Sequence, residues 1–259
     1  MNLHLQEKVI IVSGGAKGIG EGISTLLAQE GAIPVIIGRD ENDNNKFVAS
    51  LQANGYKAGQ VVAELSDPLQ CENAIKQIAA TYGRIDGLVN NAGVNDTINL
   101  ENGNYEGFMS SLHKNVVHYY LLAHHAIPYI KIAKGSIVNI SSKVADTGQG
   151  ETSGYAAANG ARNALTREWA VELLKYGIRV NAVIVAECFT PLYDKWIKFL
   201  PNPEEKLAQI QSKIPLGNRF TTTEEIANTV AFLLSSASSH TTGQLVYVDG
   251  GYTHLDRTL

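Results

Sequence analysis

Short runs of Val and Ile alternate along the chain with longer stretches in which apolar residues recur every three or four positions. The short runs predict buried β-strands at 9–12, 33–37, 58–62, 87–90, 136–140, 178–183 and 245–248. The longer stretches predict amphipathic helices at about 18–30, 45–54, 68–82, 107–130, 154–176 and 223–235. Strands that are apolar throughout and separated by helices are typical of an α/β fold. We therefore expect a doubly wound parallel sheet of about seven strands with helices on both faces.

The segment at 187–219 departs from this alternation. It holds four of the chain's seven prolines, at 191, 201, 203 and 215, with Trp196 and Phe199 between them. A long irregular segment after a sheet strand is typical of a lid over a substrate site. The rest of the chain has no Pro/Ser-rich linker, charge block or internal repeat. Residues 1–259 are therefore expected to form a single domain that carries this insert.

Composition excludes several classes of protein. A hydrophobic content of 44% fits a folded globule rather than a disordered chain. The net charge of -4, without a basic stripe, argues against a nucleic-acid partner. The apolar runs are far shorter than the roughly 18 residues that a membrane span requires. Because Cys71 and Cys188 are too few for a disulfide framework or a zinc cluster, we expect no metal site and a reducing, cytoplasmic location.

A glycine-rich loop follows the first predicted strand and opens a helix. It runs Ser13, Gly14, Gly15, Ala16, Lys17, Gly18, Ile19, Gly20. Glycines let the backbone approach a pyrophosphate, and the helix N-terminus supplies free N–H groups and a positive dipole end. The spacing Gly-x-x-x-Gly-x-Gly differs from the commoner dinucleotide fingerprint. Its place between a strand and a helix nevertheless predicts a Rossmann-type dinucleotide site rather than a plain tight turn.

The second predicted strand ends at Gly38 and Arg39, where an NAD site usually has a carboxylate for the ribose. Asp40 follows one position later. Arg39 and Lys17 could both bind a ribose 2′-phosphate, for which arginine offers a bidentate fork. We therefore expect NADP as the cofactor. NAD stays open, and two solvated surface bases are the alternative interpretation.

With these residues the chain resembles the short-chain dehydrogenase/reductase family over essentially its whole length. Residues 13–20 resemble the family's cofactor loop, with Ser13 in place of Thr, 90–93 match its Asn-Asn-Ala-Gly motif, and 178–181 match a late strand signature. The resemblance implies hydride transfer between an alcohol or carbonyl and a nicotinamide. Beyond the glycine-rich loop, it implies cofactor contacts from Glu64, Leu65, Asn91, Ala92, Gly93 and Thr190.

The resemblance also indicates a catalytic group, with one departure. In the family a tyrosine is the general acid/base, a serine hydrogen-bonds the reacting oxygen, and an asparagine holds a water relay. Tyr155, Ser142 and Asn115 match these positions. The family's fourth member is a lysine four residues after the tyrosine, but Asn159 stands there. Because a neutral amide does not favour the phenolate as an ammonium does, we expect activity reduced by about 10²-fold or more, and raised by Asn159→Lys.

Two other cations lie close to these residues in the sequence. Arg162 is seven residues after Tyr155 and three after Asn159, so all three share a helix face. Lys143 follows Ser142, and strand alternation points it away from that serine unless the strand has ended. Either cation could replace the missing lysine, but we expect both to be ordinary surface charges.

Polar residues gather at the predicted carboxyl ends of strands, where open α/β sheets bind ligands. Candidates for substrate binding are Asn95, Gln149 and Glu187. Such a set suits a polyhydroxylated substrate better than a steroid or an acyl chain. The stretches 165–170, 190–193, 240–243 and 248–257 are similar to bacterial L-fucose dehydrogenases of the family. That similarity implies oxidation of L-fucose or a similar aldose, with Tyr155 taking the hydroxyl proton.

In this family the helices at about 107–130 and 154–176 commonly pair with their symmetry mates. We expect a homodimer or homotetramer that uses a wide apolar surface formed by Tyr119, Tyr120, Leu121, Leu122, Trp169 and Leu173. Two alternatives to a sugar oxidoreductase stay open. One is a catalytically weak nucleotide-binding sensor or assembly subunit, which Asn159 favours. The other is a 3-oxoacyl-type carbonyl reductase.

Overall fold

The computed structural model describes residues 2–255, which are built around one parallel sheet. Its seven strands lie in the order β3-β2-β1-β4-β5-β6-β7, so the winding direction reverses between β1 and β4. The strands are β1 Val9–Ser13, β2 Ile33–Gly38, β3 Gly59–Val62, β4 Gly87–Asn90, β5 Ser136–Ser142, β6 Arg179–Val185 and β7 Leu245–Val248. The predicted α/β class and doubly wound sheet are confirmed. Ligands of such sheets bind beyond the carboxyl ends of the strands, at the point of reversal.

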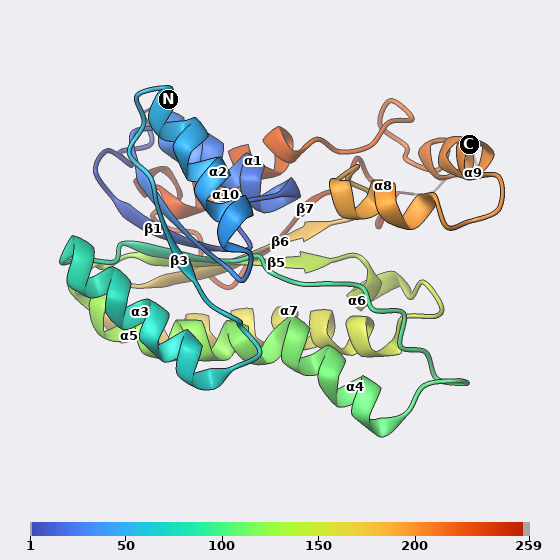
Figure 1. Cartoon of the computed structure of the whole chain (residues 1–259), viewed down its shortest axis with the longest axis horizontal. Coiled ribbons are helices and arrows are strands. Elements are labelled where there is room, and N and C mark those ends of the chain that lie inside the picture. Colours follow the sequence, from blue (N-terminus) through green and yellow to red (C-terminus); the bar gives the residue numbers. More distant parts are fainter. Residues whose placement is uncertain (1, 256–259) are drawn as a thin grey trace.

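The strands are apolar throughout because helices cover both faces of the sheet. Figure 1 shows α3, α4, α5 and α7 below the sheet, and α1, α2 and α10 above it. Neighbouring residues of a strand point to opposite faces. Accordingly, Ile11 packs in the core cluster of α3, α5 and α7, whereas Ile10 packs in that of α1 and α10.

The outer surface expected from the long helices is not formed by the residues that we named for it. Tyr119, Leu122, Trp169 and Leu173 are all buried, and they pack in the core cluster beneath the sheet. Leu121 is partly buried against the same cluster. Of that set, Tyr120 is the exposed member, with 51% of its side chain accessible. The apolar stripe of each helix therefore serves this chain's own core.

Of the long helices on the two faces, α2, α3 and α10 begin at a residue whose side chain caps the first turn, whereas α1 and α7 have no side-chain cap. Their bounds are α1 Gly18–Gln29, α2 Glu41–Ala53, α3 Pro68–Tyr82, α7 Ser153–Leu173 and α10 Thr223–Leu234. The shorter elements are α6 Val144–Thr147, η2 Leu174–Tyr176 and η3 Ser236–Ser238. Helix α2 begins four residues earlier than predicted because the Asp40 side chain accepts a hydrogen bond from Asp43 N at 3.0 Å. Within residues 2–255, no helix is both long enough and apolar enough to cross a bilayer.

The helix predicted at 107–130 consists of three pieces. Helices α4 (Tyr105–Leu112) and α5 (His118–Ala133) are joined by a π-helical turn, η1 (His113–Val117). A π turn interrupts the regular i→i−4 hydrogen-bond ladder, and such turns are frequent at functional sites. Asn115 lies in this turn and its side chain is fully buried.

The segment at 187–219 contains two short helices, which corrects the expectation of an irregular insert. Helix α8 spans Pro191–Ile197 and helix α9 spans Pro203–Gln211. Each starts at a proline, because the fixed φ and missing N–H of proline are tolerated in the first turn of a helix. Figure 1 shows α8 and α9 beyond the arrowheads of β5 and β6, and we keep the name lid for the segment at 187–219 after the role expected from the sequence.

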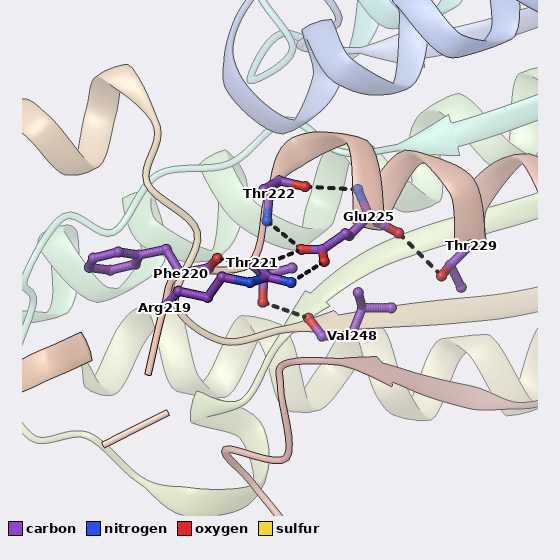
Figure 2. A network of polar contacts seen from close by, with 7 residues as sticks. All are labelled: Arg219, Phe220, Thr221, Thr222, Glu225, Thr229 and Val248. Atoms are coloured by element: carbon purple, nitrogen blue, oxygen red, sulfur yellow. Dashed lines mark hydrogen bonds and ion pairs between the residues drawn. The ribbon is translucent and has the colours of Figure 1, made fainter. Parts of the chain in front are cut away.

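The lid is joined to α10 by a polar network, shown in Figure 2. Arg219 pairs with Glu225 at 2.5 Å between Nη2 and Oε1. Thr222 and Glu225 form a reciprocal capping box, in which each side chain accepts a hydrogen bond from the other's backbone N–H. The Thr221 hydroxyl donates to the Val248 carbonyl at 3.5 Å. The end of the lid is thereby fixed to the first turn of α10 and to the end of β7.

Candidate active site

The predicted cofactor loop is held between the ends of β1 and β4. Ser13 Oγ accepts hydrogen bonds from the backbone N–H groups of Asn91 and Ala92, at 2.9 and 3.1 Å. In return Asn91 Nδ2 donates to the carbonyls of Ser13 and Gly14, at 2.9 and 3.2 Å. Gly14 has a positive φ of 64°, and a Cβ there would lie 3.1 Å from Ala92 Cα. The Asn-Asn-Ala-Gly motif therefore packs directly against the glycine-rich loop.

The start of α1 has the features of a phosphate site. Lys17 is the N-cap residue, and its side chain makes no capping hydrogen bond to the first turn. The first-turn N–H groups are thus available to an anion, at the positive end of the helix dipole. Gly18 has a φ of 56°, and a Cβ there would lie 3.3 Å from Thr190 Cβ. The loop, the uncapped helix and the first residues of the lid therefore fit a dinucleotide. Gly20 packs tightly, since a Cβ there would lie 2.1 Å from the Gly14 carbonyl oxygen.

Carboxylates accompany both cations that were predicted to bind a 2′-phosphate. Lys17 pairs with Asp43, and Arg39 Nη1 lies 3.6 Å from Glu64 Oε2. Burial would raise the pKa of Glu64, but hydrogen bonds from Ser66 and the charge of Arg39 hold it below its ordinary value. The Arg39 side chain is 80% exposed, so it can turn toward a ligand. By contrast, the Leu65 side chain packs in the core.

Asn115 is tied to its surroundings through all of its polar groups. Its side-chain Oδ1 accepts from Val94 N at 2.8 Å, and its Nδ2 donates to the Ser111 carbonyl at 3.0 Å. Its backbone carbonyl accepts from Arg162 Nε at 2.7 Å. The residue therefore connects the loop after β4 to α7, and its carbonyl already has a protein donor where the family resemblance implied a water relay.

Tyr155 and Asn159 lie one turn apart at the start of α7. Asn159 is fully buried, and its Nδ2 donates to the Tyr155 carbonyl at 2.8 Å. The Ser141 hydroxyl donates to the Asn159 carbonyl at 3.3 Å, so the end of β5 contacts this turn of the helix. Ser142 is the last residue of β5 and is 9% exposed. The structure thus brings the end of β5 against the turn of α7 that carries Tyr155.

Arg162 and Lys143 are buried, which corrects the expectation that they are surface charges. Their exposed fractions are 3% and 6%. Arg162 Nη1 donates to Asn159 Oδ1 at 2.9 Å and to the Ile140 carbonyl at 3.3 Å, while Nη2 lies 3.4 Å from Asn115 Oδ1. One side chain therefore joins three of the elements that form the predicted catalytic group.

Lys143 belongs to a second polar cluster, at the carboxyl ends of β5 and β6. The strand ends at Ser142, and the helical backbone of Lys143 turns its side chain toward Glu187, with which it forms an ion pair. The Tyr193 hydroxyl, from the lid, donates to Glu187 Oε2 at 2.9 Å. The Lys143 ammonium also lies 3.8 Å from the centre of the Tyr252 ring. Sequence reasoning missed both tyrosines, because they come from distant segments.

The other two predicted substrate residues lie apart from this cluster. Asn95 is exposed, and its side chain accepts a local hydrogen bond from Thr97 N at 3.2 Å. Gln149 is exposed in the loop between α6 and α7. Of the three predicted substrate residues, Glu187 is the part-buried one whose side chain hydrogen-bonds those of Lys143 and Tyr193.

The chain is similar to proteins of known activity along nearly its full length. A family model described as enoyl-(acyl carrier protein) reductase matches residues 14–253. The chain is 36% identical to the 3-oxoacyl-[acyl-carrier-protein] reductase of Thermotoga maritima, over 96% of this chain and 99% of that protein. It is 32% identical to the L-fucose dehydrogenase of Oryctolagus cuniculus, over 94% of this chain and 84% of that protein.

Solved structures agree with these matches. The crystal structure of Cj0485 dehydrogenase is 47% identical, with a TM-score of 0.94 over 100% of this chain and 99% of the other. The aldohexose dehydrogenase of Thermoplasma acidophilum is 29% identical, with a TM-score of 0.89 over 100% of this chain and 99% of the other. Together with the glycine-rich loop and the Tyr155 site, these matches show that the chain belongs to the short-chain dehydrogenase/reductase family of oxidoreductases, whose cofactor is a nicotinamide dinucleotide.

Proposed function

We propose that this chain is an NADP-dependent oxidoreductase acting on a polyhydroxylated alcohol or carbonyl, in particular L-fucose or a similar aldose at its anomeric carbon. The observation that carries the substrate class is the ion pair of buried Lys143 with part-buried Glu187, beside Ser142. An ammonium and a carboxylate offer hydrogen-bond donors and acceptors to sugar hydroxyls. An acyl chain or a steroid would instead favour an apolar wall. Among the similar proteins, the L-fucose and aldohexose dehydrogenases carry names that agree with this class.

The residues of the site have distinct roles in this reaction. A nicotinamide dinucleotide held by the glycine-rich loop would supply the acceptor for the hydride that leaves the alcohol carbon. Tyr155 takes the hydroxyl proton, so that the alcohol becomes a carbonyl and one proton is released for each hydride transferred. Ser142 donates a hydrogen bond to the reacting oxygen, and Glu187 orients the remaining hydroxyls from the far side. The reverse reaction uses the same groups with the proton returning from Tyr155.

The preference for NADP rests on Arg39 and Lys17. Both lie at the end of the sheet where the adenosine ribose of a dinucleotide would lie, and Arg39 is largely exposed. A 2′-phosphate would displace Glu64 and Asp43 as partners of these cations, with bidentate hydrogen bonds from the guanidinium. NAD, which lacks this phosphate, would leave the two ion pairs intact.

The test is a turnover assay that follows the reduced-nicotinamide absorbance with a panel of aldoses, polyols and 3-oxoacyl thioesters, each with NADP and NAD. We expect oxidation of aldoses with NADP, lost in Tyr155→Phe. Turnover confined to 3-oxoacyl thioesters would replace the sugar by an acyl substrate. Tight dinucleotide binding without turnover of any compound would instead favour a nucleotide-binding sensor or assembly subunit.

A further inference from the structure

The Arg162 guanidinium is a buried positive charge that no carboxylate of the described residues neutralises. Its guanidinium donates only to neutral acceptors, namely two backbone carbonyls and two amide oxygens. Among residues 2–255, no carboxylate forms an ion pair with it. Burying an uncompensated cation is costly unless hydrogen bonds and nearby electron-rich groups stabilise it. A charge kept in this way is available to stabilise an anion that forms close by.

The guanidinium lies directly behind the predicted reaction centre. Its carbon is 4.3 Å from the centre of the Tyr119 ring and 6.0 Å from that of the Tyr155 ring. A Cβ built on Gly93 would lie 2.9 Å from Arg162 Nη2, so the loop after β4 passes over the same group. Arg162 is therefore enclosed between the Asn-Asn-Ala-Gly loop, the π turn and the helix that carries Tyr155.

We infer that Arg162 is the positioning residue that replaces the missing lysine: its guanidinium stabilises the Tyr155 phenolate by charge, while Asn159 hydrogen-bonds both the guanidinium and the backbone carbonyl of Tyr155. This inference rests on the proposed function, because that function gives Tyr155 its acid/base role. The positive charge thus stands at position 162, three residues after position 159, where the family has its lysine. Asn159 Oδ1 accepts from Arg162, and Asn159 Nδ2 donates to the Tyr155 carbonyl. The amide thus fills the position from which the family's ammonium would act.

An arginine in place of the family's lysine changes how protons can move through the site. An arginine keeps its proton at every working pH, so Arg162 supplies a fixed charge and cannot pass a proton onward as a lysine can. The Asn115 carbonyl, which would hold the relay water, is occupied by Arg162 Nε. One of the two lone pairs of this carbonyl oxygen is therefore already used by a protein donor, which leaves one for a water.

The neighbouring charged and titratable groups do not supply the same effect. Lys143 is buried near Ser142, but Glu187 neutralises it. Burial, together with the charge of Arg162, lowers the pKa of His118 to about 3. Burial raises the pKa of Tyr119, although the Arg162 charge opposes this. His118 and Tyr119 therefore stay neutral between pH 5 and pH 9, and Arg162 carries the only unneutralised charge of this set.

The contact between Arg162 and Asn159 changes what we expect of Asn159→Lys, which the sequence alone predicted to raise activity. A lysine there would place an ammonium against the guanidinium that now donates to Asn159 Oδ1 at 2.9 Å. Two like charges in a buried site repel each other. We expect the single variant Asn159→Lys to be less stable than the parent chain and no faster. The pair Asn159→Lys and Arg162→Met, which moves one charge back to the lysine position, should be active.

The decisive experiment compares pH profiles of kcat for the parent chain, Arg162→Met, Arg162→Lys and the double variant Asn159→Lys/Arg162→Met. Arg162→Met should lower kcat at pH 7 by about 10- to 100-fold, the scale of a charge about 6 Å away at moderate dielectric. Its acid limb should move to higher pH, whereas KM changes little. Arg162→Lys and the double variant should keep the parent acid limb. A loss in Arg162→Met that is equal at every pH, or a double variant as slow as Arg162→Met, would overturn the inference.

Arg179 provides the matched control. It is also a part-buried arginine that donates to backbone carbonyls, those of Leu233, Leu234 and Ser235, but it lies at the amino end of β6. Arg179→Met should lower the melting temperature without moving the pH profile. If Arg162→Met does not fold, the double variant still tests the inference. The inference requires that the pH profile of the double variant match that of the parent chain. If Tyr155→Phe is as active as the parent, the proposed function fails first, independently of Arg162.

Discussion

The ion pair of Lys143 and Glu187 shows, at the scale of single residues, how the site is both stabilised and made specific. Removing one member of a buried pair leaves the other charge without a partner, which typically costs about 3–5 kcal/mol. Glu187→Gln should therefore lower the free energy of unfolding by about that amount and raise KM for the sugar. Urea denaturation and steady-state kinetics measure the two effects.

The double variant Lys143→Met/Glu187→Leu separates these effects. Replacing both charges by apolar residues of similar size is often neutral or stabilising. We expect it to recover most of the stability lost in Glu187→Gln while the KM for the sugar stays high. A double variant with the parent KM would show that this pair does not contact the substrate.

Arg39 tests cofactor choice at the same scale. Its guanidinium is exposed and only loosely paired with Glu64, at 3.6 Å. A charged hydrogen bond is typically worth about 1.5–3 kcal/mol, so Arg39→Ala should lower kcat/KM for NADP by about tenfold or more. The value for NAD should stay nearly constant. Lys57→Ala is the control, because Lys57 is an exposed cation that pairs with Glu7 elsewhere on the surface. Equal losses with both cofactors would contradict a 2′-phosphate site at Arg39.

The burial of two charged residues was not predicted from the sequence. Charged side chains are rarely buried, which led to the expectation that Arg162 and Lys143 face solvent. A signal for Arg162 was nevertheless present. Positions 159, 162, 166, 169 and 173 follow one helical stripe, and the stripe that includes Trp169 and Leu173 is the buried face of α7. For Lys143 no local signal exists, because its partners Glu187 and Tyr252 come from segments far along the chain.

At the scale of elements, the first turn of α10 shows how a cap couples stability to pH. A hydrogen bond from Arg219, followed by one from the Thr222 backbone, lowers the pKa of Glu225 from 4.5 to about 2. A carboxyl group with a depressed pKa stabilises the fold above its ordinary pKa, and the contribution is lost as the pH falls toward the depressed value. Glu225→Gln should therefore lower the melting temperature at pH 7, and the difference from the parent should shrink between pH 4.5 and pH 2.

Glu224→Gln is the control for this prediction. Glu224 is exposed in the same helical turn and experiences the same helix dipole, but the capping box uses Glu225. Its substitution should change the melting temperature little at any pH. A Glu225→Gln deficit that is the same at pH 7 and pH 3 would mean that packing, rather than charge, accounts for the effect. Because the Glu225 side chain is 39% exposed, added salt should reduce the difference.

Most elements could be predicted because their signals are local. The strands are short runs of Val and Ile, and α3 was predicted with its observed bounds, as Pro68 and Asp67 mark its start and Gly83 its end. The π turn at Asn115 could not be predicted, since no local signal distinguishes it from the α-helix on either side and the Asn115 carbonyl finds its partner, Arg162, on the distant helix α7. The two lid helices were missed because prolines were interpreted as breaks, although each proline begins a helix.

At the scale of the whole molecule, the exposed apolar side chains of α5 and α7 are the candidates for the subunit interface that is expected from the sequence. Residues buried in the chain's own core cannot serve an interface, which excludes Trp169 and Leu173. Tyr120, Ile132 and Val171 are exposed by 51%, 85% and 67%. Large apolar side chains that a monomer leaves exposed are candidates for an interaction site when they gather in one patch. The expected homodimer or homotetramer would therefore use these outward positions rather than the stripe that the sequence pattern suggested.

Val171→Glu tests this assignment, because a carboxylate placed in an apolar interface must be desolvated without a partner. Sedimentation velocity should show the parent chain as a dimer or tetramer and the variant shifted toward the monomer. Val62→Glu is the control, since Val62 is also exposed, by 45%, but ends β3 at the opposite edge of the sheet from β7. Association retained in Val171→Glu would place the interface elsewhere. Because Arg39 and Lys17, which are proposed to bind the 2′-phosphate, belong to the same chain as the glycine-rich loop, the monomeric variant should still bind NADP.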